Sequence, residues 1–538
     1  MAKSRNGETA RRSKSKSHKL MKRRSRKLEE EEQESTPVVD SFTLLMDAAR
    51  CANEDTIMRL YLEQFDLSCV DEDGNTALHI AAMNGHAYIC RILIVLASPV
   101  RLWEVKNNAG LTAEDLAHGD KVKEDLKLLR EGKPRKEDVN TQLNDALLQK
   151  FDSWKPNGKV LVALDGGGVK ILVIIQILLC IDKELNGELL SRLDWIAGTS
   201  SGGISALMLC HGKTLDQTKR FFLENRFRVF CGNKAKVPKH DSKGIENAAK
   251  ELFGFEHMGS FPKSGPRVVV TVADTRRTPA NLVLFRSFAP QIPEALREQL
   301  DYLDPEKILI WKAARCTSAA PFYFDSFNGL SDGGLVANNP TQALIADFLQ
   351  TTRLEKNYSP VKENGPEPCM ACVISVGTGS SPAESTNGID INFSSFIANK
   401  RNPLQMARNF MTAVNNAKNM LQILVRECTS SSGQPVRYSR EWCHSLNVPF
   451  FRFSPMLMKA VPLDNTDTDV LMQMLWETEC YIRGPGAHEI QQLVNYLKLK
   501  PILRIVDSTQ SDEVKEEGSD VVDAPVPGLE EDSVDYRD

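Results

Sequence analysis

The pentapeptide at residues 198–202, GTSSG, constrains the fold of this chain more than any other feature. It follows a short apolar run, residues 194–197, and precedes an apolar run typical of a helix. A G-x-S-x-G turn between a strand and a helix bends so sharply that glycines, here Gly198 and Gly202, are favoured beside the central serine. The turn raises the hydroxyl of Ser200 towards the N-terminus of the helix. It therefore predicts a serine nucleophile, with a plain Gly/Ser-rich loop as the alternative.

A second glycine-rich stretch precedes this turn. Residues 159–164 form an apolar run bounded by glycines, which predicts a buried strand. Gly166, Gly167 and Gly168 follow, and glycines let a backbone approach a ligand and direct successive N–H groups at one point. A nucleotide loop is disfavoured, because no Gly-Lys-Ser/Thr ending is present and Ile171 occupies the place of the last glycine in G-x-G-x-x-G. We therefore expect an oxyanion hole, in which one donor is typically worth about 10²–10³-fold in rate.

An acidic turn follows later in the chain. Ser331-Asp332-Gly333-Gly334 comes after the apolar stretch 321–324. An Asp that leads into two glycines presents its carboxylate with little steric cover, although the tripeptide alone is typical of an Asx turn on the surface. The order of glycine loop, serine turn and acidic turn favours a carboxylate that serves the serine.

In this order the three motifs resemble those of the patatin-like phospholipases, whose members use a Ser–Asp dyad without a catalytic histidine. The resemblance covers about residues 158–500 and is strongest towards the animal calcium-independent phospholipases A2, which carry ankyrin repeats before the patatin domain. Two features depart from the family pattern: Ile171 replaces a glycine, and the ankyrin portion is much shorter than in the long members. Further similar segments are residues 313–324, 332–340, 374–379, 440–443 and 475–479.

The resemblance implies an α/β fold, a patatin-like three-layer α/β/α catalytic domain behind a short all-α ankyrin segment. Strand candidates before Gly166, Gly198 and Gly377 agree with it, because active residues of open parallel sheets gather at the C-terminal ends of strands. It also implies a phospholipase A2-type hydrolase that releases fatty acid and lysophospholipid. In it, Ser200 attacks the ester and Asp332 accepts the serine proton.

We expect the reaction to need no metal ion or other cofactor. Nothing in the sequence resembles the oxygen-rich calcium loop D-x-[DN]-x-[DN]-G. Lys170 and Arg315 lie near the motifs and are candidates to meet the lipid phosphate, since arginine forms bidentate phosphate contacts. A structural ion pair is the alternative for Arg315.

Several alternatives stay open from the residues alone. A histidine could complete a Ser–Asp–His order through His444 or His488, although no histidine of the catalytic region lies in a comparable turn. The other histidines of that region are His211, His240 and His257. An ankyrin adaptor with an inactive patatin-like domain is a second reading, and a triacylglycerol lipase or lysophospholipase on the same fold is a third.

An internal repeat precedes the catalytic region. Residues 73–86 are close to the ankyrin turn and first helix, and similar patterns begin 33 residues earlier and 36 residues later. A period near 33 is the ankyrin spacing, and about three repeats are needed to share a core. We expect His79 to make a structural hydrogen bond within the stack, and the repeats to dock a protein partner or a second subunit.

Charge is segregated towards the two ends of a chain of 538 residues with a net charge of −4. Residues 1–27 are basic and the tail after residue 507 is acidic, so both ends are expected to be disordered. The basic arm is a solvated tail, a nuclear-targeting signal or an attachment to anionic lipid. No apolar run suits a secretory signal or a membrane span, and twelve scattered cysteines fit a reducing compartment.

These features predict a cytoplasmic protein that associates peripherally with a phospholipid membrane and binds no nucleic acid. The helix-like stretch 403–426 is most simply core-facing, with a calmodulin-type target helix or a membrane-surface helix as alternatives. The expected boundaries are a disordered arm at 1–40, ankyrin repeats at 41–130, a linker at 131–157, the catalytic domain with its C-terminal extension at 158–500 and an acidic tail at 501–538.

Overall fold

The structure, a computed structural model, describes residues 40–132, 139–151, 153–232, 238–358, 366–382 and 432–501. The stretch 403–426, the basic arm and nearly all of the acidic tail lie outside these ranges. No helix within them is long and apolar enough to cross a bilayer.

The N-terminal part is a stack of paired helices. Its helices are α2 (Ser41–Cys51), α3 (Glu54–Leu62), α4 (Ala77–Met83), α5 (Ala87–Ala97), α6 (Ala113–Leu116) and α7 (Asp120–Glu131). Thr76 and Thr112 cap α4 and α6 with the same capping box, 36 residues apart. The buried imidazole of His79 bonds Thr76 through Nδ1 and the carbonyl of Leu111 in the next repeat through Nε2, at 3.2 Å. The structural role expected for His79 is confirmed.

The catalytic region is built on one mixed sheet. Its strands are β1 (Gly158–Leu164), β2 (Trp195–Thr199), β3 (Arg267–Asp274), β4 (Asn281–Arg286), β5 (Leu330–Asp332), β6 (Cys369–Val376) and β7 (Phe450–Phe453). They lie in the order β4-β3-β2-β1-β6-β7, and β5 also pairs with β3. The strands β3, β2, β1, β6 and β7 are parallel to one another, whereas β4 and β5 run antiparallel to β3.

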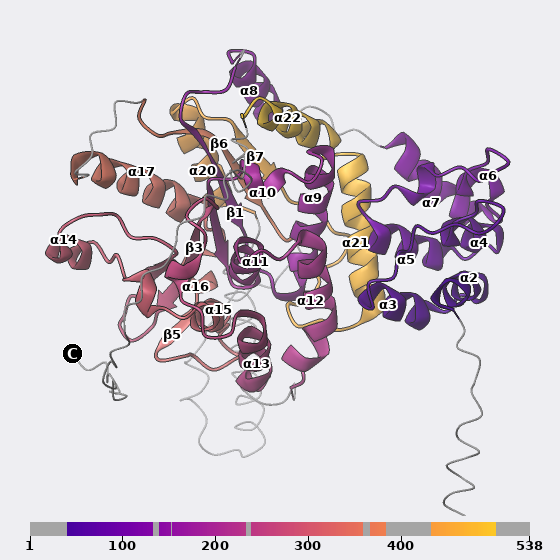
Figure 1. The fold of residues 1–538 in the computed structure, drawn as a ribbon, viewed down its shortest axis with the longest axis horizontal. Coiled ribbons are helices and arrows are strands. Elements are labelled where there is room, and N and C mark those ends of the chain that lie inside the picture. Colours follow the sequence, from indigo (N-terminus) through magenta and orange to yellow (C-terminus); the bar gives the residue numbers. More distant parts are fainter. Residues whose placement is uncertain are drawn as a thin grey trace, which may run out of the picture. The chain divides into compact units, whose positions relative to one another are not determined.

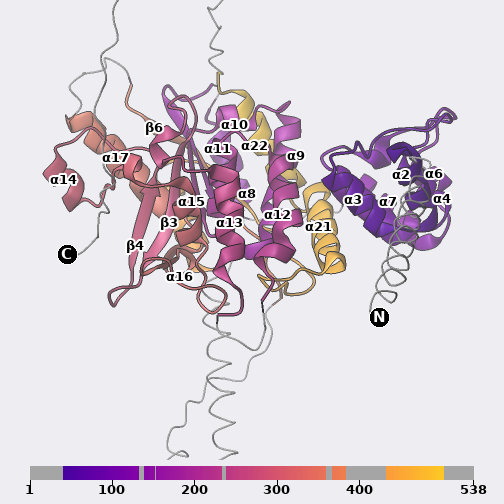
Figure 2. The ribbon, with the colours of Figure 1, turned by 60° about the horizontal axis from the view of Figure 1, so that its bottom comes forward.

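Helices cover both faces of this sheet, as a parallel sheet that is apolar on both faces requires. Figures 1 and 2 show the sheet with α17 on one side and α9, α11 and α12 on the other. Alternate residues of β1 divide between the two cores: Val160 and Val162 pack with the α9 side, and Leu161 with the α17 side. The expected three-layer α/β/α arrangement is confirmed.

The helices of this region are α8 (Val139–Leu148), α9 (Ile171–Glu184), α10 (Leu189–Arg192), α11 (Ser201–Cys210), α12 (Leu215–Val229), α13 (Ser242–Phe253), α14 (Glu294–Gln299), α15 (Ile310–Thr317), α16 (Gly334–Ala337), α17 (Thr341–Tyr358), α20 (Gln434–Ser445), α21 (Thr468–Arg483) and α22 (Ala487–Lys498). Helix α8 falls in the expected linker, yet its buried Asn144 pairs with the backbone of Phe450 at 2.7 and 3.1 Å. This part of the linker therefore covers the edge strand β7.

The ankyrin helices α5 and α7 pack against α21 of the catalytic region. Arg91 of α5 pairs with Asp125 of α7 and donates to Gln473 of α21. The fully buried carboxylate of Glu479 on α21 accepts hydrogen bonds from Ser98, Gln176 and Arg483, at 3.2, 2.8 and 3.0 Å. This surface of the repeats therefore contacts the chain's own catalytic region, which leaves the other surfaces of the repeats for a protein partner or a second subunit.

We predict that Glu479→Ala lowers the free energy of unfolding by about 3–5 kcal/mol, because it leaves the nearly buried Arg483 without this carboxylate. Urea denaturation would measure the loss. Glu251, which forms an exposed ion pair with Arg228, gives the control Glu251→Ala, which should change little. Equal losses for the two variants would contradict the prediction.

Candidate active site

Three strand ends bring the predicted motifs together. Leu164, the last residue of β1, pairs with Gly198 of β2 and with Val376 of β6. Because these strands are parallel, the segments that follow them leave the sheet at the same edge. The glycine loop and the serine turn are consequently neighbours: a Cβ added to Gly166 would lie 3.1 Å from the Cβ of Ser200.

Ser200 lies on a sharp turn between β2 and α11. Its φ of 54° and ψ of −126° are unusual for a residue with a side chain, which is the geometry of a nucleophile elbow. Its N–H donates to Thr317 Oγ1 at 2.9 Å, which helps to hold the turn. Gly198 and Gly202 are required by close approach, because a Cβ on either would lie within 2.4 Å of a backbone oxygen.

Asp332 reaches the serine from β5. The carboxylate is 5% exposed, it accepts a hydrogen bond from the Gly334 N–H at 2.7 Å, and the Ser200 hydroxyl lies close enough to affect its pKa. Burial raises the pKa of the Asp332 carboxyl to about 6, although the Ser200 hydroxyl and the Gly334 amide act to lower it. Gly333 has no room for a side chain, since a Cβ there would lie 2.3 Å from Thr271 Oγ1. The acidic turn is therefore buried and not a surface Asx turn.

The amides of the glycine loop have different roles. The N–H of Gly166 donates to the carbonyl of Asn338 at 3.1 Å. It is therefore not available to an oxyanion, contrary to the expectation for this amide. The amides of Gly167 and Gly168 have no acceptor within the described ranges, and Gly168 has a φ of +56°, which favours glycine. Two of the three expected donors therefore remain.

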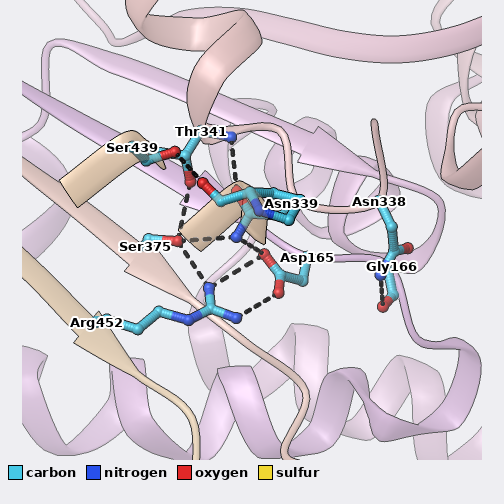
Figure 3. Close-up of polar contacts among 9 residues, drawn as sticks. Asp165, Gly166, Asn338, Asn339, Thr341, Ser375, Ser439 and Arg452 are labelled. Carbon is cyan, nitrogen blue, oxygen red and sulfur yellow. Dashed lines mark hydrogen bonds and ion pairs between the residues drawn. The ribbon is translucent and has the colours of Figure 1, made fainter. Parts of the chain in front are cut away.

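A buried polar cluster lies next to the start of the glycine loop (Figure 3). The Arg452 guanidinium pairs with the fully buried Asp165 carboxylate at 2.6 Å and donates to Ser375 Oγ at 2.7 Å. Asn339 donates to both Asp165 and Ser375, at 3.0 and 3.2 Å. Sequence reasoning missed Arg452, for which the only signal was a charged residue within the aromatic run of β7.

An apolar pocket opens at Ser200. Its cavity volume is about 70 Å³, so the pocket is narrow. One wall comes from α12, with Phe221, Phe222 and Val229, and another comes from α13, with Ala248 and Leu252. Such a lining suits a hydrocarbon chain.

The two candidate phosphate contacts have different surroundings. Arg315 is 1% exposed, pairs with Glu246 at 3.1 Å and donates to the Asp325 carbonyl at 2.8 Å. The structural ion pair expected as the alternative for Arg315 is therefore present. Lys170 is half-buried, burial lowers its pKa to about 8, and it does not line the pocket.

The histidines bond elsewhere in the described structure. His444 contacts Asn144 at 3.4 Å and His488 lies 3.8 Å from Asp145, both in the neighbourhood of α8. His211 pairs with Glu256 and His240 with Asp464. These four histidines bond other residues than Ser200 and Asp332, so the geometry supports a two-residue site.

Comparison with known proteins identifies both parts of the chain. Residues 162–345 match the family of patatin-like phospholipases, and residues 45–142 match ankyrin repeats in three copies. Residues 162–345 therefore form a patatin-like domain, and the helices from α2 to α7 belong to ankyrin repeats. The resemblance expected from the motifs is confirmed.

Individual relatives agree with this assignment. The chain is 35% identical to the 85/88 kDa calcium-independent phospholipase A2 of Rattus norvegicus over 63% of this chain and 40% of the relative. It is 31% identical to the intracellular phospholipase A2 of Caenorhabditis elegans over 63% of this chain and 29% of the relative. The human calcium-independent phospholipase A2-gamma is 26% identical over 68% of this chain and 42% of the relative. The chain thus spans less than half the length of each of these relatives.

We predict that Arg452→Met destabilises the protein by about 3–5 kcal/mol, because it leaves the Asp165 carboxylate buried without its cation. The double variant Asp165→Asn/Arg452→Met should recover part of this loss, since no buried charge is then left alone. Urea unfolding of the three variants and the wild type measures this recovery. A double variant no more stable than Arg452→Met would contradict it.

Proposed function

We propose that the chain hydrolyses an acyl ester of glycerophospholipids, as a phospholipase A2-type enzyme, and releases a fatty acid and a lysophospholipid. The observation that carries this proposal is the buried Asp332 carboxylate beside Ser200, which itself lines an apolar pocket. The names of the relatives agree with it, and they include calcium-independent phospholipases A2.

In the first half of the reaction, Asp332 takes the proton of Ser200 as Oγ attacks the ester carbonyl carbon. The carbonyl oxygen becomes an oxyanion, which the amides of Gly167 and Gly168 stabilise. The C–O bond to the glycerol then breaks, and protonated Asp332 returns its proton to the departing alkoxide. Lysophospholipid leaves, and the acyl chain stays on Ser200 in the pocket.

In the second half, Asp332 removes a proton from water, which attacks the acyl-enzyme carbonyl. The second oxyanion uses the same two amides. Its collapse frees the fatty acid, and Ser200 recovers its proton from Asp332. One carboxylate thus serves as base and then acid in each half.

The setting of the reaction is a phospholipid membrane surface, on which the protein acts as a peripheral cytoplasmic enzyme. Met456 and Met458, in the segment after β7, are 65% and 74% exposed, and exposed apolar side chains favour an interface with lipid. A triacylglycerol lipase or lysophospholipase would share the same chemistry, so the lipid itself must be tested. The inactive-adaptor reading is less favoured, because the serine, the carboxylate and two loop amides are all in place.

We predict that Ser200→Ala loses hydrolysis of phospholipid vesicles by roughly 10⁶-fold, as expected when the nucleophile is removed. His444→Ala and His488→Ala should each keep nearly full activity, since neither residue contacts the dyad. Release of fatty acid should be measured on phospholipid vesicles and triacylglycerol emulsions, with chelator present. Equal hydrolysis by wild type and Ser200→Ala would leave the adaptor reading, and preference for the emulsion would favour a lipase.

We predict an acid limb in kcat/KM with a midpoint near pH 6, the pKa to which burial raises Asp332. The base must be deprotonated to accept the serine proton, so activity should fall about tenfold per pH unit below the midpoint. Rates measured between pH 4.5 and 8 test this, with circular dichroism to confirm that the protein stays folded. A flat profile between pH 5 and 7 would argue against Asp332 as the base.

A further inference from the structure

The segment between β7 and α21 holds the glycine loop in place. The carbonyl of Leu463 accepts a hydrogen bond from the Val169 N–H at 2.9 Å. It also lies against Gly168, where an added Cβ would come within 2.2 Å of the same oxygen. The position of this carbonyl therefore fixes Gly168, whose own N–H is one of the two remaining oxyanion donors.

The next residue along, Asp464, is held by a buried histidine. Its Oδ2 lies 3.1 Å from His240 Nε2, and the Nζ of Lys239 approaches the same oxygen at 3.6 Å. The Gly232 N–H donates to His240 Nδ1 at 3.0 Å, so Nδ1 is the acceptor nitrogen. Nε2 accordingly carries the hydrogen and donates it to the carboxylate.

His240 is itself rigidly placed. It is 5% exposed, and its backbone N–H donates to the carbonyl of Tyr323 at 2.9 Å. Its ring packs against Phe230, Phe324 and Tyr323, with centroids 5.3, 5.6 and 6.2 Å away, and all three side chains line the pocket. From the other side, Arg226 donates to the Thr466 carbonyl at 3.2 Å and to Thr468 Oγ1 at 3.0 Å.

We propose that the His240–Asp464 hydrogen bond positions the oxyanion hole: it fixes Leu463, and Leu463 fixes Gly168. This inference rests on the proposed esterase function. In this proposal His240 contacts neither Ser200 nor the reacting ester. It is therefore a positioning residue and not a catalytic one. Because small misplacements of catalytic groups are costly, losing the contact should slow the chemical step and leave lipid binding almost unchanged.

The experiment compares Asp464→Ala with Asp464→Asn, whose amide oxygen still accepts from His240 Nε2. We expect kcat of Asp464→Ala to fall roughly 10–100-fold, with KM within about twofold of the wild type. Affinity for a trifluoromethyl ketone, which forms an oxyanion on Ser200, should fall by the same factor. Asp464→Asn should recover most of both losses, and His240→Ala should resemble Asp464→Ala.

His444→Ala is the matched control, since it removes a half-buried histidine that does not contact this segment. If Asp464→Ala does not fold, Asp464→Ser replaces it, because the hydroxyl is too short to reach the imidazole. An unchanged kcat, a rise in KM alone, or equal losses for the Ala and Asn variants would each overturn the proposal. A wild type that neither hydrolyses esters nor binds the ketone would instead overturn the proposed function.

Discussion

The ion pair between Asp165 and Arg452 is the interaction on which the arrangement of the site depends. It lies at the end of β1, immediately before the glycine loop, and it brings Ser375 of β6 and Asn339 into one cluster. Asn339 follows the acidic turn, and its neighbour Asn338 accepts the Gly166 amide. The cluster therefore connects the glycine loop to the segment that carries Asp332. Two buried charges are tolerated here because each is hydrogen-bonded to several partners.

Helix α12 connects this site to the ankyrin repeats. One part of its surface lines the pocket through Phe221, Phe222 and Val229. On another part, the fully buried Lys219 donates to the carbonyl of Val95 at 2.5 Å, and Arg220 donates to the carbonyl of Tyr61 at 3.0 Å. A wall of the pocket is thus packed directly on two ankyrin repeats. A displacement of the repeats would shift this wall of the pocket, because close-packed interiors transmit strain.

Features encoded within a few neighbouring residues could be predicted from the sequence. The elbow at Ser200, the turn at Asp332 and the repeat at His79 depend on local backbone geometry, so their motifs were sufficient. Arg452 could not be predicted, because it meets Asp165 across 287 positions of the sequence and only the sheet order brings them together. The same applies to Gly166, because its amide donates to the carbonyl of Asn338, which is distant in the sequence. The ion pair of Arg315 is a similar case, since closeness to a motif in the sequence does not reveal that its guanidinium is buried against Glu246.

Burial of Asp332 makes the carboxylate a stronger base and at the same time lowers the stability of the fold. A carboxylate exposed to water is a weak base at neutral pH, and burial raises the pKa of Asp332 from 3.8 to about 6. Since the unfolded chain releases this proton more readily, folding stability decreases as pH rises from about 4 to 6. The loss above pH 6 is about 3 kcal/mol on the scale of 1.4 kcal/mol per unit of pKa. The surrounding structure stabilises the ionised carboxylate, because the Gly334 amide donates to it and the nearby Ser200 hydroxyl also lowers its pKa. The neighbours of Asp332 therefore offset part of the cost of the burial that raises its pKa.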